Sequence, residues 1–383
     1  MLHYFKNSTE IVYGSGSASR VGEILKPYKK ALTITDQGCM KANLLGPVQK
    51  SLVASGIAYE VFAEVEPNPA VEVVEQACEL LQSFGADVIV AVGGGSSLDT
   101  AKAVGILATN GGKITEYEGV ERVPVPAMPV VGIPTTAGTG SEVTINVVIT
   151  DKAREYKFTI VSRNSACRYA VLDPELTVSM PPGLTAATGM DALTHAIESY
   201  TSLMSYPLSA TLALEAIKII TRNLALAVYN GDNLVARDGM LMGCLMASLA
   251  FNNTRLGNAH AMSHPISAVF GVPHGIANAI LLPYVMEFNS VAVPDRFAAI
   301  AEAMGEDNRG LKVTQAAARA VEAVRELSQR IEIPSRLSAV ISDPNAKDKI
   351  DKLADDAMKS GNIAVNPRKT TRKDIVALFE QAW

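Results

Sequence analysis

Short apolar runs rich in β-branched residues alternate with helical stretches over roughly the first 180 residues. Apolar residues recur at helical spacing in segments such as 71–84. This alternation predicts βαβ units and a mainly parallel sheet. Three later runs, at 145–150, 157–161 and 169–173, predict further strands or a hairpin at the edge of that sheet. The four earlier strand candidates are 31–35, 59–62, 87–92 and 128–133.

The pattern changes after Pro181 and Pro182, where three segments rich in Ala, Leu and Met predict long helices. These segments are 185–200, 208–228 and 236–250, with a polar turn expected at 230–232. No comparable strand run follows. We therefore predict an α/β domain over residues 1–180 and an all-helical domain over residues 181–383.

The composition is that of a compact enzyme, with 383 residues, 48% hydrophobic, 19% charged and 28 glycines. The net charge of -5 is spread without a basic block, so we expect neither nucleic acid nor a membrane surface as a partner. The first residues lack a signal-peptide pattern and no apolar run is long enough to span a bilayer, so we expect a cytoplasmic protein. The scattered cysteines are expected to be reduced core residues; they are Cys39, Cys78, Cys167 and Cys244.

A glycine triplet, Gly93 to Gly95, follows the apolar run at 87–92, and two serines then open a helix. Glycines allow phosphate oxygens to approach the backbone, and the positive end of a helix attracts negative charge. The segment is therefore a candidate seat for a pyrophosphate. A tight βα turn capped by serine, without any ligand, is the alternative.

Two further features favour a dinucleotide. Asp36 ends the run at 31–35, where a carboxylate can accept hydrogen bonds from a ribose and would repel the 2′-phosphate of NADP. The loop 134–144 is rich in Gly, Ser and Thr and follows another strand candidate. Taken alone, Asp36 would be interpreted as an aspartate in a turn, and the loop 134–144 as an ordinary flexible loop. Because the acid precedes the glycines and the Gly-x-Gly-x-x-Gly spacing is absent, the strand order should differ from the standard Rossmann order.

The second half contains a cluster of candidate metal ligands. Asp191 and His195 lie one helical turn apart, and His260 and His264 repeat that spacing. With His274, four of the five histidines fall within 80 residues, which favours a metal site over an aspartate and a histidine that only bind each other. One carboxylate with imidazoles suits Fe(II) or Zn(II). Five candidates are too many for a site that stays open to substrate, and spacing does not say whether His260 or His264 is the bystander.

Together these motifs resemble the iron-dependent (group III) alcohol dehydrogenases over essentially the whole chain. The resemblance implies a dehydroquinate synthase-like architecture with an NAD-binding α/β domain and a helical metal domain. It implies one divalent metal, Fe2+ or alternatively Zn2+, held by Asp191, His195, His260 and His274. The matching stretches are GGGSSLDTAKA at 93–103, PTTAGTGSEVT at 134–144, AATGMDALTHAIE at 186–198 and PHG at 273–275.

The same resemblance assigns the remaining site residues. His264 would lie near the metal without binding it, and we hypothesise that it relays a proton. NAD(H) would be surrounded by ten residues of the α/β domain. They are Asp36, Asn68, Gly94, Gly95, Ser96, Thr135, Thr136, Val148, Lys157 and Leu176.

The expected reaction is reversible hydride transfer between NAD(H) and a small aldehyde or alcohol, with the metal as Lewis acid. We expect a homodimer or larger homo-oligomer. The alternative is an NAD- and metal-dependent lyase of the dehydroquinate synthase type. A protein that keeps the fold without turnover is disfavoured by the intact ligands and glycine loop.

The chain departs from the family pattern just before His260. Thr254 and Arg255 stand where many members have small residues, and Asn258 stands where an apolar residue is common. A guanidinium can bind a carboxylate or sulfonate through two hydrogen bonds, so Arg255 and Asn258 are candidate substrate residues. The alternative is an arginine paired with a structural acid. Candidate substrates are sulfoacetaldehyde or succinic semialdehyde, beside neutral lactaldehyde or ethanal.

Overall fold

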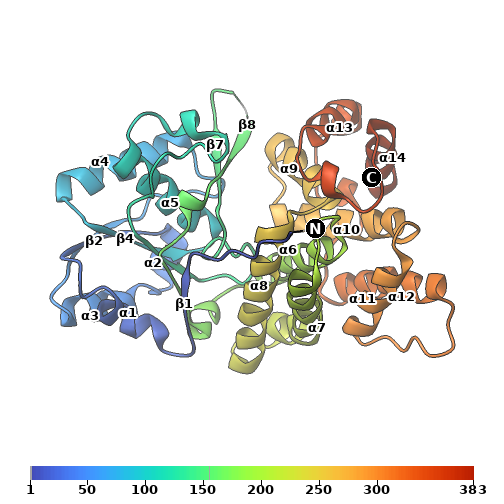
Figure 1. The fold of residues 1–383 in the computed structure, drawn as a ribbon, viewed down its shortest axis with the longest axis horizontal. Helices are drawn as coiled ribbons and strands as arrows, with labels where there is room; N and C mark the ends of the chain where they lie inside the picture. The colour runs from blue at the N-terminus through green and yellow to red at the C-terminus, as the bar shows by residue number, and fades with distance from the viewer. Residues whose placement is uncertain (1, 155) are drawn as a thin grey trace. The chain divides into compact units, whose positions relative to one another are not determined.

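The protein is described by a computed structural model, which covers residues 2–154 and 156–383. It divides into two compact units (Figure 1). One runs from Asn7 to Met180. The other comprises Pro181–Trp383 and the N-terminal residues up to Lys6, although the sequence analysis counts those first residues with the α/β domain. Their position is explained by hydrogen bonds between the backbone of Lys6 and the side chain of Asn253.

The first unit is built on a six-stranded sheet in the order β1-β9-β6-β4-β2-β3, in which every pairing is parallel. The predicted mainly parallel sheet is therefore confirmed. Its strands are β1 (Glu10–Tyr13), β2 (Lys30–Ile34), β3 (Ala58–Phe62), β4 (Val88–Gly93), β6 (Val130–Pro134) and β9 (Tyr169–Leu172).

Two expectations about the later strands need correction. The strand β9 was expected at the edge, but it pairs with both β1 and β6. The strands β7 (Asn146–Asp151) and β8 (Tyr156–Val161) form the antiparallel hairpin, which belongs to a separate small sheet with β5 (Gly119–Val120). The sequence analysis missed β1, a run of only four residues whose burial pattern is mixed.

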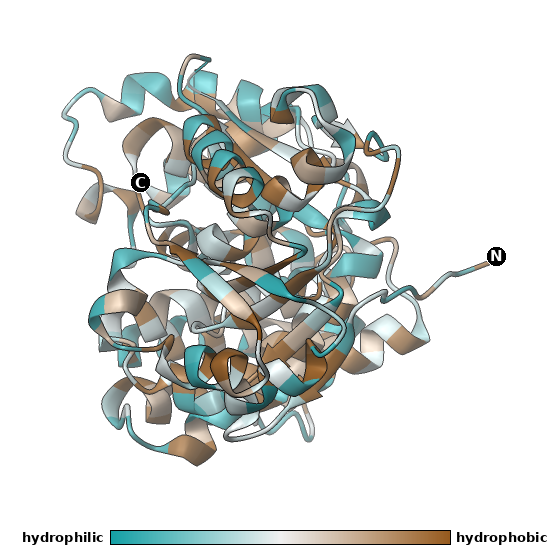
Figure 2. Cartoon of the chain, turned by 90° about the vertical axis from the view of Figure 1, so that its left-hand side faces the viewer, coloured by the Kyte–Doolittle hydropathy of each residue, from teal (hydrophilic) through white to brown (hydrophobic). Residues whose placement is uncertain are grey.

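Helices on both faces of the sheet explain why β4 is apolar throughout. Its residues Val88, Val90 and Val92 pack in a core with α1 and α3, whereas Ile89 and Ala91 pack in a second core with α4 and α5. The helices of this unit carry hydrophilic and hydrophobic residues side by side (Figure 2). They are α1 (Val21–Ile24), α2 (Gln37–Lys41), α3 (Gly46–Ala54), α4 (Val71–Phe84) and α5 (Gly95–Asn110).

The chain reverses direction across the sheet between β2 and β4. From β2 it continues through α3 to β3 on one side, and from β4 it continues through α5 to β6 on the other. In open parallel sheets, ligands bind outside the carboxyl ends of the strands at such a switch point. The standard Rossmann order places the first strand centrally, whereas β1 is here an edge strand. The prediction of a non-standard order is confirmed.

The second unit is helical, as expected, with α6, α7 and α8 packed against one another (Figure 1). Of the helices in the described residues, α8 alone is long and apolar enough to span a membrane, but 61% of its apolar window is buried inside the protein. Its hydropathy is therefore that of a core helix. The helices are α6 (Pro182–Thr201), α7 (Pro207–Tyr229), α8 (Leu234–Thr254), α9 (Asn258–Phe270), α10 (His274–Ser290), α11 (Pro294–Met304), α12 (Val313–Arg330), α13 (Ile350–Met358) and α14 (Arg372–Ala382).

Candidate active site

Three helices of the second unit bring the predicted metal ligands together. The buried face of α6 carries Asp191 and His195, α9 carries His260, and His274 is the first residue of α10. One ligand atom from each of Asp191, His195 and His260 lies within 4.8 Å of the other two. All three side chains are buried, so the cluster belongs to the interior of the unit.

The Asp191 carboxylate is the centre of the cluster. Its Oδ1 lies 3.6 Å from His260 Nε2 and 3.7 Å from His274 Nε2. Ligand atoms bound at about 2.1 Å around a tetrahedral ion are about 3.4 Å apart. The spacing of these atoms therefore suits a single small cation.

The electrostatics also favour a cation. Burial raises the pKa of Asp191, but the charges of His195 and His274 and the hydrogen bond with His260 outweigh it and lower the pKa well below its usual range. Burial lowers the pKa of His260, but Asp191 and Glu198 raise it to about 9. The cluster thus stabilises positive charge among its imidazoles. A divalent ion supplies the same charge, and the donor set of one carboxylate and three imidazoles fits Fe(II) or Zn(II).

Aromatic stacking fixes His195, while His264 stands beside the ligands. The ring of His195 lies between those of Phe251 and His260, at centroid distances of 4.4 and 4.5 Å. The ring of His264 lies 5.1 Å from that of His274 and 6.3 Å from that of His260. His264 therefore adjoins the cluster and is only partly buried.

Two residues that touch the predicted ligands were not expected from the sequence. Asn278 donates from Nδ2 to Asp191 Oδ1 at 2.7 Å, and the same nitrogen lies 3.1 Å from Nε2 of both His260 and His274. Its Oδ1 is buried without a partner among the described residues. Glu198 contacts the other ring nitrogen of His260. Helical spacing could have indicated both, because Asn278 follows His274 by four residues and Glu198 follows His195 by three.

The two candidate substrate residues lie in different surroundings. Arg255 is exposed at the end of α8, and its guanidinium makes no hydrogen bond or ion pair with any residue that the structure describes. The alternative of an arginine paired with a structural acid therefore lacks support. Asn258 is fully buried, and its Nδ2 donates to Thr370 Oγ1 at 2.9 Å.

The candidate nucleotide residues of the first unit lie after adjacent parallel strands. Asp36 follows β2 and caps α2 by accepting from the Cys39 N–H at 3.0 Å. Its Oδ2 also accepts from the Ser97 hydroxyl at 3.2 Å and from the Cys39 thiol. These bonds join the end of β2 to the start of the helix after β4, and they fix the carboxylate at the switch point.

The glycine triplet has the close packing expected of a phosphate seat. Gly94 is the N-cap of α5 and has no side chain to satisfy the free N–H groups of the first turn, which include that of Ser96. A Cβ on Gly95 would lie 2.8 Å from Thr139, and one on Gly94 would lie 3.5 Å from Thr136. The glycine turn and the loop 134–144 thus lie together, with bare N–H groups that suit an anion.

The other candidate nucleotide residues belong to the same unit. Lys157 on β8 donates to Asn68 Oδ1 at 2.8 Å, and burial lowers the pKa of Lys157 to about 8. Val148 on β7 donates its N–H to Asp99 at 3.0 Å. Two further residues follow strands of the large sheet at their carboxyl ends, Thr135 after β6 and Leu176 after β9.

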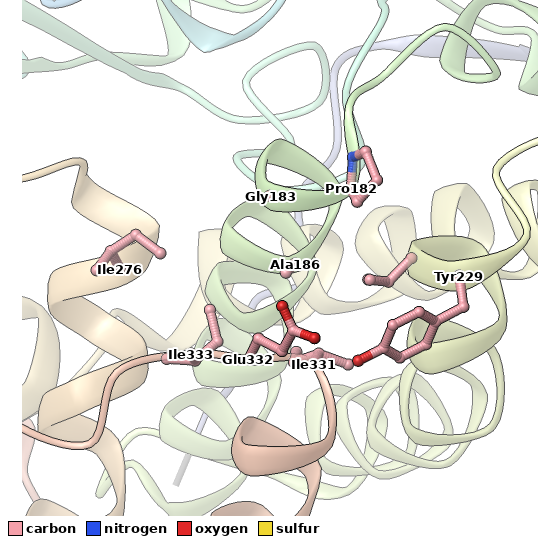
Figure 3. A pocket seen from close by; sticks show the side chains of 9 residues that line it. Pro182, Gly183, Ala186, Tyr229, Ile276, Ile331, Glu332 and Ile333 are labelled. Atoms are coloured by element: carbon pink, nitrogen blue, oxygen red, sulfur yellow. The ribbon is translucent and has the colours of Figure 1, made fainter.

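A separate cavity of about 170 Å³ lies in the helical unit (Figure 3). It is lined by residues at the start of α6 and α10, at the end of α7 and just after α12, including Ala186, Tyr229, Ile276 and Glu332. None of the clustered acid and histidine residues lines it. We therefore assign it no part in the site.

Two family models cover the chain almost completely. Residues 8–174 match the iron-containing alcohol dehydrogenase model, and residues 185–383 match the C-terminal model of the Fe-containing alcohol dehydrogenase family. The chain belongs to the iron-containing alcohol dehydrogenase family. It is therefore an oxidoreductase of the iron-dependent alcohol dehydrogenase type, as the motifs indicated.

Individual relatives agree over nearly their full length. The chain is 43% identical to a 1,3-propanediol dehydrogenase of Citrobacter freundii over 97% of this chain and 96% of the relative. It is 40% identical to an NAD-dependent methanol dehydrogenase of Bacillus methanolicus, with both chains fully covered. A solved 1,3-propanediol oxidoreductase matches at a TM-score of 0.97, 40% identity and full coverage of both chains. A sulfoacetaldehyde reductase of Bifidobacterium kashiwanohense, solved with NAD+, matches at 0.88 and 29%, covering 100% of this chain and 99% of that one.

Replacing Asp36 by Ser should relax the expected preference for NAD over NADP. Serine can still cap α2, but it removes the negative charge that would repel a 2′-phosphate. We expect the ratio of kcat/KM for NADPH to that for NADH to rise by about tenfold or more, equivalent to about 1.4 kcal/mol. The matched control is Ser97→Ala, which removes a partner of Asp36 and keeps its charge. An unchanged ratio in Asp36→Ser would remove Asp36 from cofactor selection.

Proposed function

We propose that the protein is an NAD(H)- and metal-dependent alcohol dehydrogenase that reduces a short-chain aldehyde or oxidises the corresponding alcohol. The observation that carries the proposal is the buried cluster around Asp191 in a chain of this family. Fe2+ is the proposed metal, with Zn2+ as the alternative for the same ligands. The ligands are Asp191, His195, His260 and His274.

The nucleotide is proposed to bind at the carboxyl ends of the parallel strands. The first-turn N–H groups of α5 would receive its pyrophosphate, and the fixed carboxylate of Asp36 would accept from its adenosine ribose. The ammonium of Lys157 would add positive charge. The full proposed set is Asp36, Asn68, Gly94, Gly95, Ser96, Thr135, Thr136, Val148, Lys157 and Leu176.

The proposed reaction is RCHO + NADH + H⁺ giving RCH2OH + NAD⁺. When bound, the metal would supply Lewis acidity that polarises the carbonyl, and NADH would supply the hydride. The protein's own residues would hold the metal, orient the nucleotide and supply the proton. No side-chain nucleophile is needed, since no covalent bond to the protein forms.

His264 is the proposed proton carrier. Its ring lies 5.1 Å from that of His274, which orients it beside the cluster. It is also partly exposed, so it can exchange protons with water. An imidazole is well matched to proton transfer near neutral pH.

Arg255 is the proposed determinant of the substrate's tail. Its guanidinium is exposed and has no ion-pair partner among the described residues, so it is available to a carboxylate or sulfonate. This observation favours an anionic aldehyde such as sulfoacetaldehyde or succinic semialdehyde. Neutral aldehydes remain in the proposal because two of the more similar relatives, a 1,3-propanediol and a methanol dehydrogenase, are named for neutral alcohols. Asn258 is bonded to Thr370, so we base the substrate-tail proposal on Arg255 alone.

We further propose that the protein acts in the cytoplasm as a homodimer or larger homo-oligomer. Its four cysteines are buried and form no disulfide in the part of the chain that the structure describes, which agrees with a reducing compartment. Large apolar side chains are exposed on the helical unit, such as Leu203 at 65% and Val235 at 79%, and they favour self-association.

The test of the proposed function combines metal analysis with a substrate screen. Protein purified without oxygen should contain about one divalent metal per chain, and NADH should be oxidised with release of the matching alcohol. A panel of short aldehydes, neutral and anionic, identifies the substrate class. Failure to reduce any aldehyde with Fe2+ or Zn2+ restored would refute the dehydrogenase proposal. NADH use without a released alcohol would favour the lyase of the dehydroquinate synthase type.

Replacing His264 by Ala should slow turnover while sparing the metal. We expect kcat to fall by about 100-fold, the lower end of the usual contribution of a proton-transfer group. Metal content should equal that of the wild type, and added imidazole should restore part of the rate. The control is His3→Ala, which changes the histidine stacked on Tyr206. Metal loss from His264→Ala would mean that this residue is a ligand.

Replacing Arg255 by Ala should lower the preference for anionic aldehydes. A charge-assisted hydrogen bond contributes about 1.5–3 kcal/mol, so kcat/KM for an anionic aldehyde should fall roughly 10- to 100-fold. The rate with ethanal should change little. Arg255→Lys serves as the control, because it keeps the charge and loses the two-pronged geometry. If the anionic-to-neutral ratio is the same in wild type and Arg255→Ala, Arg255 does not contact the substrate.

A further inference from the structure

Glu198 is a buried carboxylate next to the cluster of candidate metal ligands. The proposed function gives it no role. It lies seven residues after Asp191 and three after His195, so the same face of α6 carries all three side chains. It is 4% exposed. Buried carboxylates are rare unless they are paired, so its partners identify its role.

The first set of partners is the N-terminus of α9. Glu198 accepts from the Gly257 N–H at 2.9 Å and from the Ala259 N–H at 2.6 Å. Gly257 is the N-cap of α9 and has no side chain with which to cap it. A Cβ on Gly257 would lie 2.9 Å from Glu198 Oε1, which explains the glycine. Glu198 thus replaces the missing cap and fixes the position where α9 begins.

The second partner is the His260 ring. Nδ1 of His260 lies 2.6 Å from Glu198 Oε2. An ionised carboxylate only accepts hydrogen bonds, so Nδ1 must carry the hydrogen. The lone pair of the neutral ring is then on Nε2, the atom that lies 3.6 Å from Asp191 Oδ1. Glu198 therefore selects the tautomer of His260 that can bind a metal.

Charge provides a third contribution. Asp191 and Glu198 are both buried and together carry two negative charges when ionised. With neutral imidazoles, a divalent cation balances these charges. An unbalanced charge in a protein interior is strongly unfavourable, so removal of either carboxylate should weaken retention of the cation.

We propose that Glu198 is a positioning residue of the metal centre, which fixes the tautomer and orientation of His260 and balances the charge of a divalent metal. This inference rests on the proposed function, because it requires that the cluster binds a metal. Glu198 makes no contact of its own with the metal in this role. It acts through His260 and through its negative charge.

The experiment measures the affinity of the full chain for Zn2+ and Co2+ by competition with a chelator. Glutamine at position 198 keeps one oxygen acceptor, but its NH2 group cannot accept from a backbone N–H and it carries no charge. We expect metal to bind about 10- to 100-fold more weakly to Glu198→Gln than to wild type, as for other partners of ligand histidines. Equal affinities would overturn the inference.

The control separates metal positioning from loss of a helix cap. Asn233 caps α8 by accepting from the Ala236 N–H at 3.1 Å, and it lies about 25 Å along that helix from Phe251, which stacks on His195. Asn233→Ala should lower the melting temperature of the metal-free protein and leave metal affinity unchanged. If Asn233→Ala weakens metal binding as much as Glu198→Gln does, the effect is general destabilisation and the inference fails.

A double-mutant cycle tests whether Glu198 acts through His260. Once His260→Ala has removed the ring, Glu198→Gln should weaken metal binding less than it does in the wild type, because only the loss of its charge remains. Fully additive losses would overturn the inference. If Glu198→Gln does not fold, Glu198→Asp takes its place: the shorter side chain keeps the charge but withdraws from Nδ1, and its affinity must also fall. A wild-type protein that binds no metal would refute the proposed function itself, which is a different outcome.

Discussion

The helical unit depends on the burial of charge along one face of α6. The Asp191 carboxylate lies within 4 Å of imidazole nitrogens from α9 and α10, and the Asn278 amide also donates to it. A carboxylate in the interior is tolerated only when such partners are present. Three helices from distant parts of the sequence must therefore pack in one arrangement to satisfy it. The packing that stabilises the unit also assembles the candidate metal ligands.

The α/β unit meets a different constraint, which is the direction of its strands. Parallel strands place all of their carboxyl ends at one edge, and the reversal between β2 and β4 leaves the loops there free to diverge. Asp36 and the glycine turn come together for this reason, although they are almost sixty residues apart. Hydrogen bonds from Ser97 and Cys39 then fix the carboxylate. The nucleotide binding proposed for this edge of the sheet relies mainly on backbone N–H groups and on the fixed carboxylate of Asp36.

Local pattern was sufficient to predict most strands of the first unit and the first three helices of the second. The β-branched runs became strands, and the Ala- and Leu-rich segments became α6, α7 and α8. Strand order was less accessible, because a strand of four residues such as β1 is too short to show a recognisable period. Its pairing with β9 makes β9 an interior strand instead of the edge strand.

In the candidate site, too, local pattern identified some residues, whereas others could be recognised only from the tertiary structure. Histidines are few and cluster visibly, so the ligand candidates could be named. Glu198 and Asn278 belong to residue types that are common on helix surfaces. They are buried here because the start of α9 contacts Glu198 and α10 packs against α6. The hydrogen bond from the Asn258 side chain to the Thr370 hydroxyl joins residues 112 positions apart, which no spacing rule anticipates.

The central claim is that Asp191, His195, His260 and His274 bind one metal. Anomalous diffraction at the iron edge, from crystals of protein loaded with Fe2+ without oxygen, tests this claim most directly. If these four residues bind one metal, the anomalous map should contain one strong peak per chain, about 2.0–2.2 Å from one ligand atom of each of them. A peak within bonding distance of His264, or the absence of a peak within bonding distance of Asp191, would contradict this ligand assignment.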